Sequence, residues 1–126
     1  MGMTDQQILR VIYQWGCETQ KSTIENDLQI ILGSELITLK GQGLIHVNGS
    51  SVALTAKGIA AVESASLVSA EVIANNAKAR EMVRKAMRSV LEHDNAGYNG
   101  TMAEARKTFT PRFVASVERY YALNLP

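Results

Sequence analysis

One stretch constrains the fold more than any other part of this 126-residue chain: GSELITLKGQGLIHVNGSSVALTAKG, from Gly33 to Gly58. Residues 44–47 and 52–55 are two short runs rich in β-forming side chains. Asn48-Gly49 lies between them and is a strong hairpin signal, because both residues tolerate a positive φ. The stretch therefore predicts a β-hairpin.

The faces of this hairpin follow from the parity of its apolar positions. A two-residue loop and a four-residue loop place the same side chains on the same face. In either case the apolar face consists of Ile45, Val47, Val52 and Leu54, and the opposite face carries His46 and Ser51. We expect Ile45 and Leu54 to face the helices.

Three helices are predicted before the hairpin. The first carries an apolar stripe within residues 8–15, and the second carries one made of Ile24, Leu28, Ile31 and Leu32. The third is short and ends near the glycines at 41 and 43. Two positions remain open for the joint between the second and third helices. It lies at Gly33, or nearer Gln29 with a longer third helix that reaches Gln42.

This pattern resembles the winged helix-turn-helix domain of small bacterial and phage transcriptional regulators of the MarR and PadR type. The resemblance rests on Gly33-x-x-Leu36-x-x-Leu39-x-x-x-Gly43-Leu44-Ile45, then a hairpin, then Leu54-Thr55-x-Lys57-Gly58. It covers residues 4–65, about half of the chain. It implies a mainly α fold with a small β-hairpin, a DNA-binding function in transcription regulation, and double-stranded DNA as partner.

The same resemblance implies which side chains contact DNA. The helix before the wing presents side chains to base edges, and the wing lies along the phosphates. The helix candidates are Gln29, Ser34, Thr38 and Lys40, and the wing candidates are His46, Asn48, Ser50 and Ser51.

The distribution of charge argues against DNA binding. Residues 1–58 carry four basic and five acidic side chains, a balance of −1, whereas residues 59–126 carry nine and seven, a balance of +2. The DNA-binding domain of a protein usually carries the more positive net charge. The second hypothesis is therefore a non-enzymatic adaptor that keeps the winged-helix fold but docks on protein.

Residues 66–126 are predicted to form a helical dimerisation extension. Ala56–Asp94 holds no proline and is rich in alanine, and we expect a break among the serines at 64, 66 and 69. Beyond that break a heptad-like seam steps by four and three through Val72, Asn76, Ala79, Val83, Ala86 and Val90. We expect this seam to hold a homodimer. The alternative is that it packs within the chain, onto the winged-helix domain of residues 4–65.

The same helix carries a basic ridge. Arg80, Arg84 and Arg88 recur at intervals of four, so they lie on one face. The ridge is suited to phosphate or to an acidic partner, and the alternative is a solvated flank. After this helix, residues 93–100 are predicted to form a loop by composition, and Thr110-Pro111 begins the last helix.

Several classes of function find no support in the sequence. Cys17 is the only cysteine, which excludes an internal disulfide and favours a cytoplasmic location. Two distant histidines and one cysteine predict no metal site. The chain has no Gly-rich phosphate loop, nucleophile elbow or HExxH motif, so we expect no enzyme and no cofactor. No apolar run is long enough to span a membrane, so we expect no membrane partner.

Overall fold

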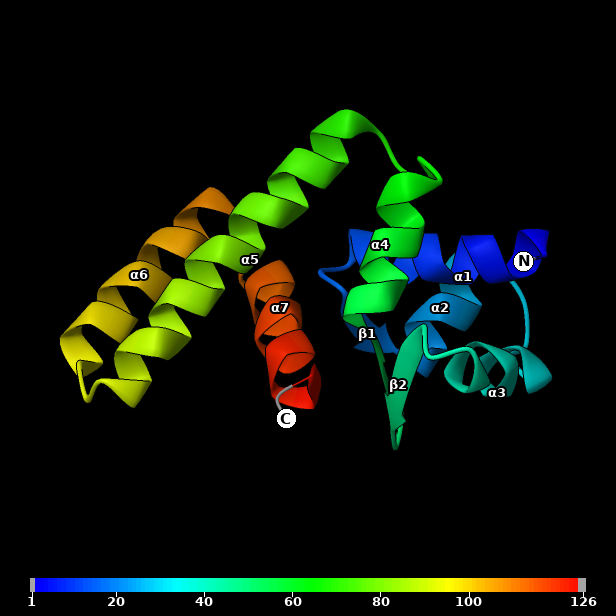
Figure 1. Ribbon diagram of the computed structural model, residues 1–126, viewed down its shortest axis with the longest axis horizontal. Coiled ribbons are helices and arrows are strands. Elements are labelled where there is room, and N and C mark those ends of the chain that lie inside the picture. Colours follow the sequence, from blue (N-terminus) through cyan, green and yellow to red (C-terminus); the bar gives the residue numbers. More distant parts are fainter. Residues whose placement is uncertain (1, 125–126) are drawn as a thin grey trace.

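The computed structural model describes residues 2–124 and is mainly helical, with one three-stranded antiparallel sheet (Figure 1). The predicted mainly α fold with a small β-hairpin is confirmed. The elements are α1 Met3–Gln14, β1 Glu18–Gln20, α2 Lys21–Leu28, α3 Ser34–Gly41, β2 Ile45–Asn48, β3 Ser51–Leu54, α4 Ala56–Ser64, α5 Ala70–Leu91, α6 Asn95–Thr108 and α7 Pro111–Asn124.

The hairpin has the predicted faces. Strand β2 pairs with β3 so that Ile45 lies opposite Leu54 and Asn48 lies opposite Ser51. The loop therefore has two residues, and Gly49 takes the left-handed conformation that such a tight turn requires, with φ of 62°. Ile45 and Leu54 are both buried in the core, as the parity predicted.

A third strand was not predicted. Residues Glu18–Gln20 pair antiparallel with β3, which gives the sheet the order β1-β3-β2. The strand follows a sharp change of direction at Gly16 and Cys17, which have φ of 108° and 69°. Val52, Ala53 and Leu54 of the central strand β3 are all buried, although successive side chains of a strand point to opposite faces. Both faces of the sheet are therefore covered.

The core consists of two apolar clusters. The first joins α1, the sheet and α4, and the second joins α5, α6 and α7. Helices α5 and α6 lie antiparallel as an arm that extends away from α1–α4 (Figure 1). Helix α7 lies between the arm and the sheet, and it contributes Val114 and Val117 to the second cluster but Tyr120 to the first.

The second helix ends where one of the two alternatives placed the joint, near Gln29, and so excludes Ile31 and Leu32 of the predicted stripe. Helix α2 ends at Leu28, and its cap Gln29 has φ of 55°. The backbone N–H of Leu32 donates to the carboxylate of Glu25 at 2.8 Å, which stabilises residues 30–33 as a loop. The break thus lies at Gln29, but α3 begins only at Ser34. Ile31, expected on the buried stripe of α2, is 89% exposed.

The predicted dimer seam is wrong, because most of it is buried within one chain. Asn76, Ala79, Val83 and Ala86 are almost wholly inaccessible, and Val72 is half-buried. The last three of the buried residues lie in the cluster that α5 forms with α6 and α7. Of the six seam residues, only Val90 is classed as exposed, at 46%. The regular spacing marked a buried face whose partners are the later helices of the same chain.

The loop predicted at residues 93–100 is mostly helix. Helix α6 begins at Asn95, and the carboxylate of its cap Asp94 accepts a hydrogen bond from the N–H of Gly97 at 2.8 Å. A Cβ at residue 97 would lie 2.2 Å from the same carboxylate, so glycine leaves room for the cap. Met102 and Ala105 are then buried in the second cluster, which compensates for the weak helix propensity of the glycines.

Candidate functional site

The exposed face of α3 is the principal candidate surface. Leu36 and Leu39 are buried and fix the orientation of this helix against the core. The opposite stripe, spaced i, i+3 and i+4, consists of Ser34, Ile37 and Thr38. All three are exposed, and Ile37 is 74% accessible. The stripe carries two hydroxyl groups beside one apolar side chain, and no charge.

The charges of α3 lie at its ends. Glu35 is in the first turn, where its carboxylate accepts from the N–H of Gly33 at 2.7 Å. Backbone hydrogen bonds from Gly33 and from its own N–H lower the pKa of Glu35. Lys40 is exposed in the last turn, and the Nζ of Lys57 donates to the carbonyl of Gln42 at 3.0 Å just beyond it. The carboxyl end of α3 is therefore the positive end of this surface.

Three of the four predicted wing residues, His46, Asn48 and Ser50, are exposed, and Ser51 is half-buried. Asn48 and Ser50 are exposed at the hairpin tip, where the hydroxyl of Ser50 donates to Oε1 of Gln20. His46 and Ser51 lie on the face toward α7. The ring of His46 lies 3.1 Å from Oδ1 of Asn124, and the hydroxyl of Ser51 donates to Glu18.

Gln29 does not belong to the α3 surface. It is the left-handed cap of α2, and its side-chain amide donates to the carbonyl of Asn26 at 2.7 Å. The assignment of Gln29 to the helix before the hairpin was wrong, because the α2–α3 loop separates it from Ser34. The remaining predicted helix residues, Ser34, Thr38 and Lys40, do share α3 and are exposed.

Glu18 was missed by the sequence reasoning although it joins α7 to the sheet. Its side chain is fully buried, and Nε of Arg119 lies 3.0 Å from its Oε2. No element was predicted at residues 18–20, so nothing indicated that this carboxylate is buried. Further along α7, the amide of Asn124 donates to the carbonyl of Leu54 at 2.9 Å. These contacts hold α7 against the sheet.

The predicted basic ridge is wrong at Arg80. Its Nη2 lies 3.0 Å from Oε2 of Glu63, and its Nε donates to Oδ1 of Asn76 at 2.8 Å. Its side chain is only 19% exposed, so it holds α5 to α4 rather than facing solvent. Arg84 and Arg88 are exposed on the arm, as the spacing predicted.

Asn76 is the centre of a buried polar network. Its Nδ2 donates to the carbonyl of Tyr13 at 2.8 Å, and its Oδ1 accepts from Sγ of Cys17 at 3.3 Å as well as from Arg80. The hydroxyl of Tyr13 donates to the Glu63 carboxylate at 2.8 Å. The network thus joins α1, α4 and α5, and its hydrogen bonds hold these three helices together.

Burial of Cys17 gives a testable pH dependence. Desolvation by burial raises the pKa of the Cys17 thiol from 9.0 to about 12. The unfolded chain therefore loses this proton first, so the stability due to the neutral thiol is complete below about pH 9 and is lost as the pH rises toward the folded pKa. We expect the free energy of unfolding of Cys17→Ala to fall less between about pH 9 and 11 than that of the wild type.

Chemical denaturation at a series of pH values measures this difference. Desolvation by burial also raises the pKa of Tyr13 and, to about 12, that of Tyr120. The free energy of unfolding of Cys17→Ala should therefore also fall at high pH, but less than that of the wild type. Parallel pH profiles for the wild type and Cys17→Ala would contradict the assignment of a buried neutral thiol.

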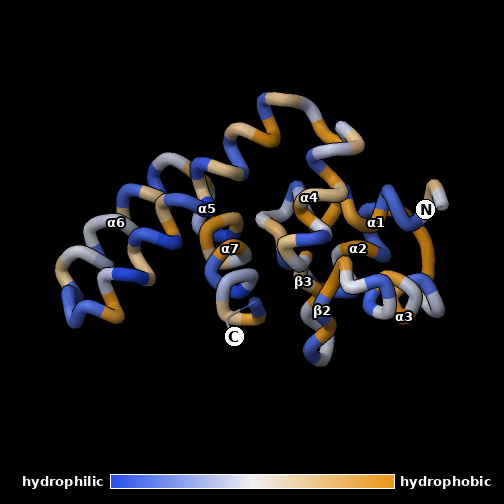
Figure 2. Tube along the Cα trace, viewed as in Figure 1, coloured by the Kyte–Doolittle hydropathy of each residue, from blue (hydrophilic) through white to orange (hydrophobic). Residues whose placement is uncertain are grey.

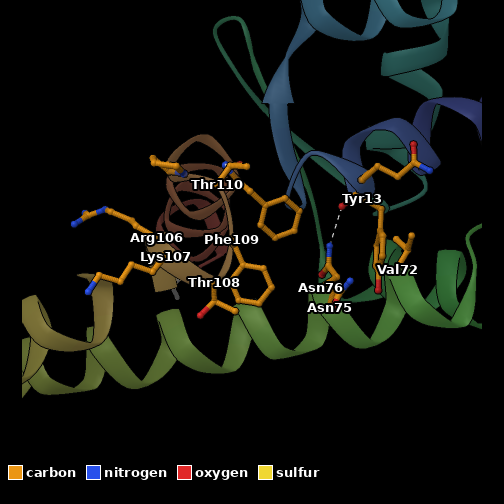
Figure 3. Close-up of a pocket in the computed structure, with 12 residues that line it drawn as sticks. Tyr13, Val72, Asn75, Asn76, Arg106, Lys107, Thr108, Phe109 and Thr110 are labelled. Carbon is orange, nitrogen blue, oxygen red and sulfur yellow. Dashed lines mark hydrogen bonds between the residues drawn. The ribbon is translucent and has the colours of Figure 1, made fainter. Parts of the chain in front are cut away.

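A cavity of about 720 Å³ lies where the arm meets α1. Tyr13, Val72 and Asn76 line one side, and Phe109 lines the other (Figure 3). Phe113, whose ring centroid lies 5.9 Å from that of Phe109, also lines the cavity. Arg106 and Lys107 stand at its edge, but their side chains extend away from Asn76 (Figure 3). The cavity has the size of a small-molecule site, and the exposed amide of Asn75 lines it together with the aromatic rings.

Other kinds of site have no counterpart in the described part of the chain. Among residues 2–124, no three His, Cys, Asp or Glu side chains gather as a metal site would require. Over the same range, no helix is both long and apolar enough to cross a membrane.

No family model, curated protein or solved structure matches this chain. The function is therefore inferred from its own surfaces. Two of them are open and distinctive: the α3 stripe with the hairpin tip, and the arm that carries Arg84 and Arg88.

Proposed function

We propose that this protein is a non-enzymatic, cytoplasmic transcriptional regulator of the winged helix-turn-helix kind, which binds double-stranded DNA as a dimer. The observation that carries the proposal is the uncharged, exposed stripe of α3. This helix follows α2 after a short loop and precedes a two-stranded hairpin, which is the order that the resemblance implies.

The chemistry of the stripe suits the major groove. A helix fits in that groove and reads base edges through hydrogen bonds and apolar contacts. The hydroxyls of Ser34 and Thr38 hydrogen-bond to base edges, and Ile37 contacts a thymine methyl group. Lys40 and Lys57 contact phosphates at the carboxyl end of α3, and Asn48 and Ser50 lie toward the backbone of the neighbouring groove.

The small number of cations sets a quantitative expectation. Each phosphate neutralised contributes about −0.9 to the slope of log K against log salt. Two lysines beside α3 therefore give a slope of about −2 per chain. Such weak electrostatic attraction agrees with the −1 balance of residues 1–58, and it leaves most of the affinity to base contacts and to the pairing of two chains.

Selection from a pool of randomised duplexes tests this function. We expect Thr38→Ala to change the selected sequence, because its hydroxyl faces base edges. We expect Lys40→Ala with Lys57→Ala to weaken binding to all duplexes alike and to remove most of the salt slope.

The matched control is Lys78→Ala with Lys85→Ala, two exposed lysines of α5 that do not line the groove on the arm. It also removes two exposed cations, but they lie on the arm, away from α3 (Figure 1). These changes should leave the salt slope of a single chain unaltered. If no duplex is retained at low salt, the DNA-binding proposal fails.

A second candidate function is docking on a protein. The observation that favours it is the pair of exposed isoleucines, Ile31 at 89% and Ile37 at 74%. The α2–α3 loop is an apolar segment at the outer edge of the molecule (Figure 2). Failure of the duplex selection would favour this adaptor, which would use the same α3 surface for an apolar partner.

A further inference from the structure

An apolar groove of about 480 Å³ runs along the arm, far from α3. Its apolar lining comes from the carboxyl half of α5, the first turn of α6 and the carboxyl half of α7: Met87, Val90, Leu91, Tyr98 and Tyr121. Val90 and Leu91 are 46% and 82% exposed. Leu91 therefore projects from the rim as an uncovered apolar side chain beside an uncovered apolar recess.

The two rims of the groove carry opposite charges. Arg84 and Arg88 lie one helical turn apart on α5, and Glu118 lies opposite on α7. The hydroxyl of Tyr98 donates to the Glu118 carboxylate at 3.0 Å, which fixes its position. Within residues 2–124 none of these three charged side chains forms an ion pair.

We propose that this groove binds the same groove of a second copy of the chain. The surface is self-complementary, because it holds both a projecting apolar side chain and a recess, and both a basic and an acidic rim. A two-fold axis places Leu91 of each copy in the recess of the other and sets Arg84 and Arg88 against the partner's Glu118. An isologous interface requires this kind of self-complementarity.

The proposal concerns the dimer and is independent of DNA contact, although it rests on the dimeric state in the proposed function. It replaces the heptad seam with a neighbouring face of the same helix. Met87 and Leu91 lie on this face with the arginines, at intervals of three and four, whereas Ala79, Val83 and Ala86 of the seam face α6 and α7.

Light scattering of the DNA-free protein, from low to high micromolar concentration, tests the apolar contact. We expect a wild-type dimer and a monomeric Leu91→Glu chain, with the dimer Kd raised at least about a hundredfold because the carboxylate enters an apolar recess. Leu91 is so exposed that this change leaves the fold intact, which circular dichroism verifies. The matched control is Ile37→Glu, an equally exposed residue on α3, which should remain dimeric.

A charge swap tests the orientation. Arg84→Glu with Arg88→Glu, and separately Glu118→Arg, each place like charges across the two-fold axis, so each variant alone should be monomeric. An equimolar mixture restores opposite charges at both rims and should form heterodimers. Association of either variant alone, or none in the mixture, would overturn the pairing.

The outcomes separate the groove from the rest of the proposal. A monomeric wild type at high micromolar concentration removes the dimer from the proposed function as well as the groove. A wild-type dimer that survives Leu91→Glu but dissociates with Ile37→Glu overturns the groove alone and moves the interface to α3. Loss of duplex binding in a chain that still dimerises through the groove affects the DNA proposal alone.

Discussion

Replacement of Gly58 by alanine is expected to lower the free energy of unfolding by about 3 kcal/mol, near the upper end of overpacking costs. A Cβ at this position would lie 2.1 Å from the carbonyl oxygen of Leu44 and 3.2 Å from its carbonyl carbon. Both are backbone atoms, so no side-chain rotation relieves the overlap. Helix α4 would have to move away from the residue that leads into β2.

The free-energy cost of this overlap is larger than the gain in helix propensity that alanine brings. Alanine is favoured over glycine inside a helix by about 1 kcal/mol. The N–H of Gly58 also donates to Oγ1 of Thr55, so movement of the helix weakens the cap at the start of α4. Chemical denaturation measures the difference from the wild type.

Gly41→Ala is the matched control. Gly41 is the last residue of α3, and a Cβ there has nothing within 4 Å. The same substitution should therefore be neutral or stabilising by less than about 1 kcal/mol. Equal effects of the two substitutions would mean that the contact between α4 and Leu44 is not tight.

The second large effect is expected for Asn76→Leu, which should cost about 2–4 kcal/mol. The two side chains are similar in size, but leucine makes no hydrogen bonds. The substitution removes the acceptor of Arg80 Nε and of the Cys17 thiol, and the side-chain donor to the carbonyl of Tyr13. Since Asn76 is 1% exposed, water does not replace these partners.

Asn75→Leu provides the control for this substitution. Asn75 precedes it on α5, but it is exposed and lines the cavity where the arm meets α1. Asn75→Leu should therefore change the free energy of unfolding by no more than about 0.5 kcal/mol. An Asn76→Leu chain as stable as the wild type would show that packing compensates fully for the lost hydrogen bonds.

The hairpin was predictable because its signals are local. Asn48-Gly49 and the alternation of Ile45 to Leu54 depend on residues that are neighbours in the sequence. Strand β1 has three residues and no alternation of its own, and it exists because β3 offers an edge for pairing. Helix α6 likewise overrides a loop-like composition through packing against α5.

Periodicity identified faces but not their partners. The spacing from Val72 to Val90 was recognised correctly as an apolar seam, yet spacing carries no information on whether the partner helix belongs to the same chain. Arg80 was misassigned for a similar reason, because Glu63, its partner, lies on another helix. Exposure of Ser34, Thr38 and Lys40 was predictable, since the buried Leu36 and Leu39 define the opposite face of the same short helix.

The placement of α7 has a consequence for synthesis. This helix is the last described element, yet Arg119 neutralises the buried Glu18, and Tyr120 completes the cluster of α1 and the sheet. The sheet is complete at Leu54, whereas α7 begins 57 residues later at Pro111, so during synthesis the second face of the sheet stays uncovered until α7 has emerged from the ribosome. Until α7 is made, the nascent chain therefore has a sheet with one face exposed to solvent, and α7 then covers that face.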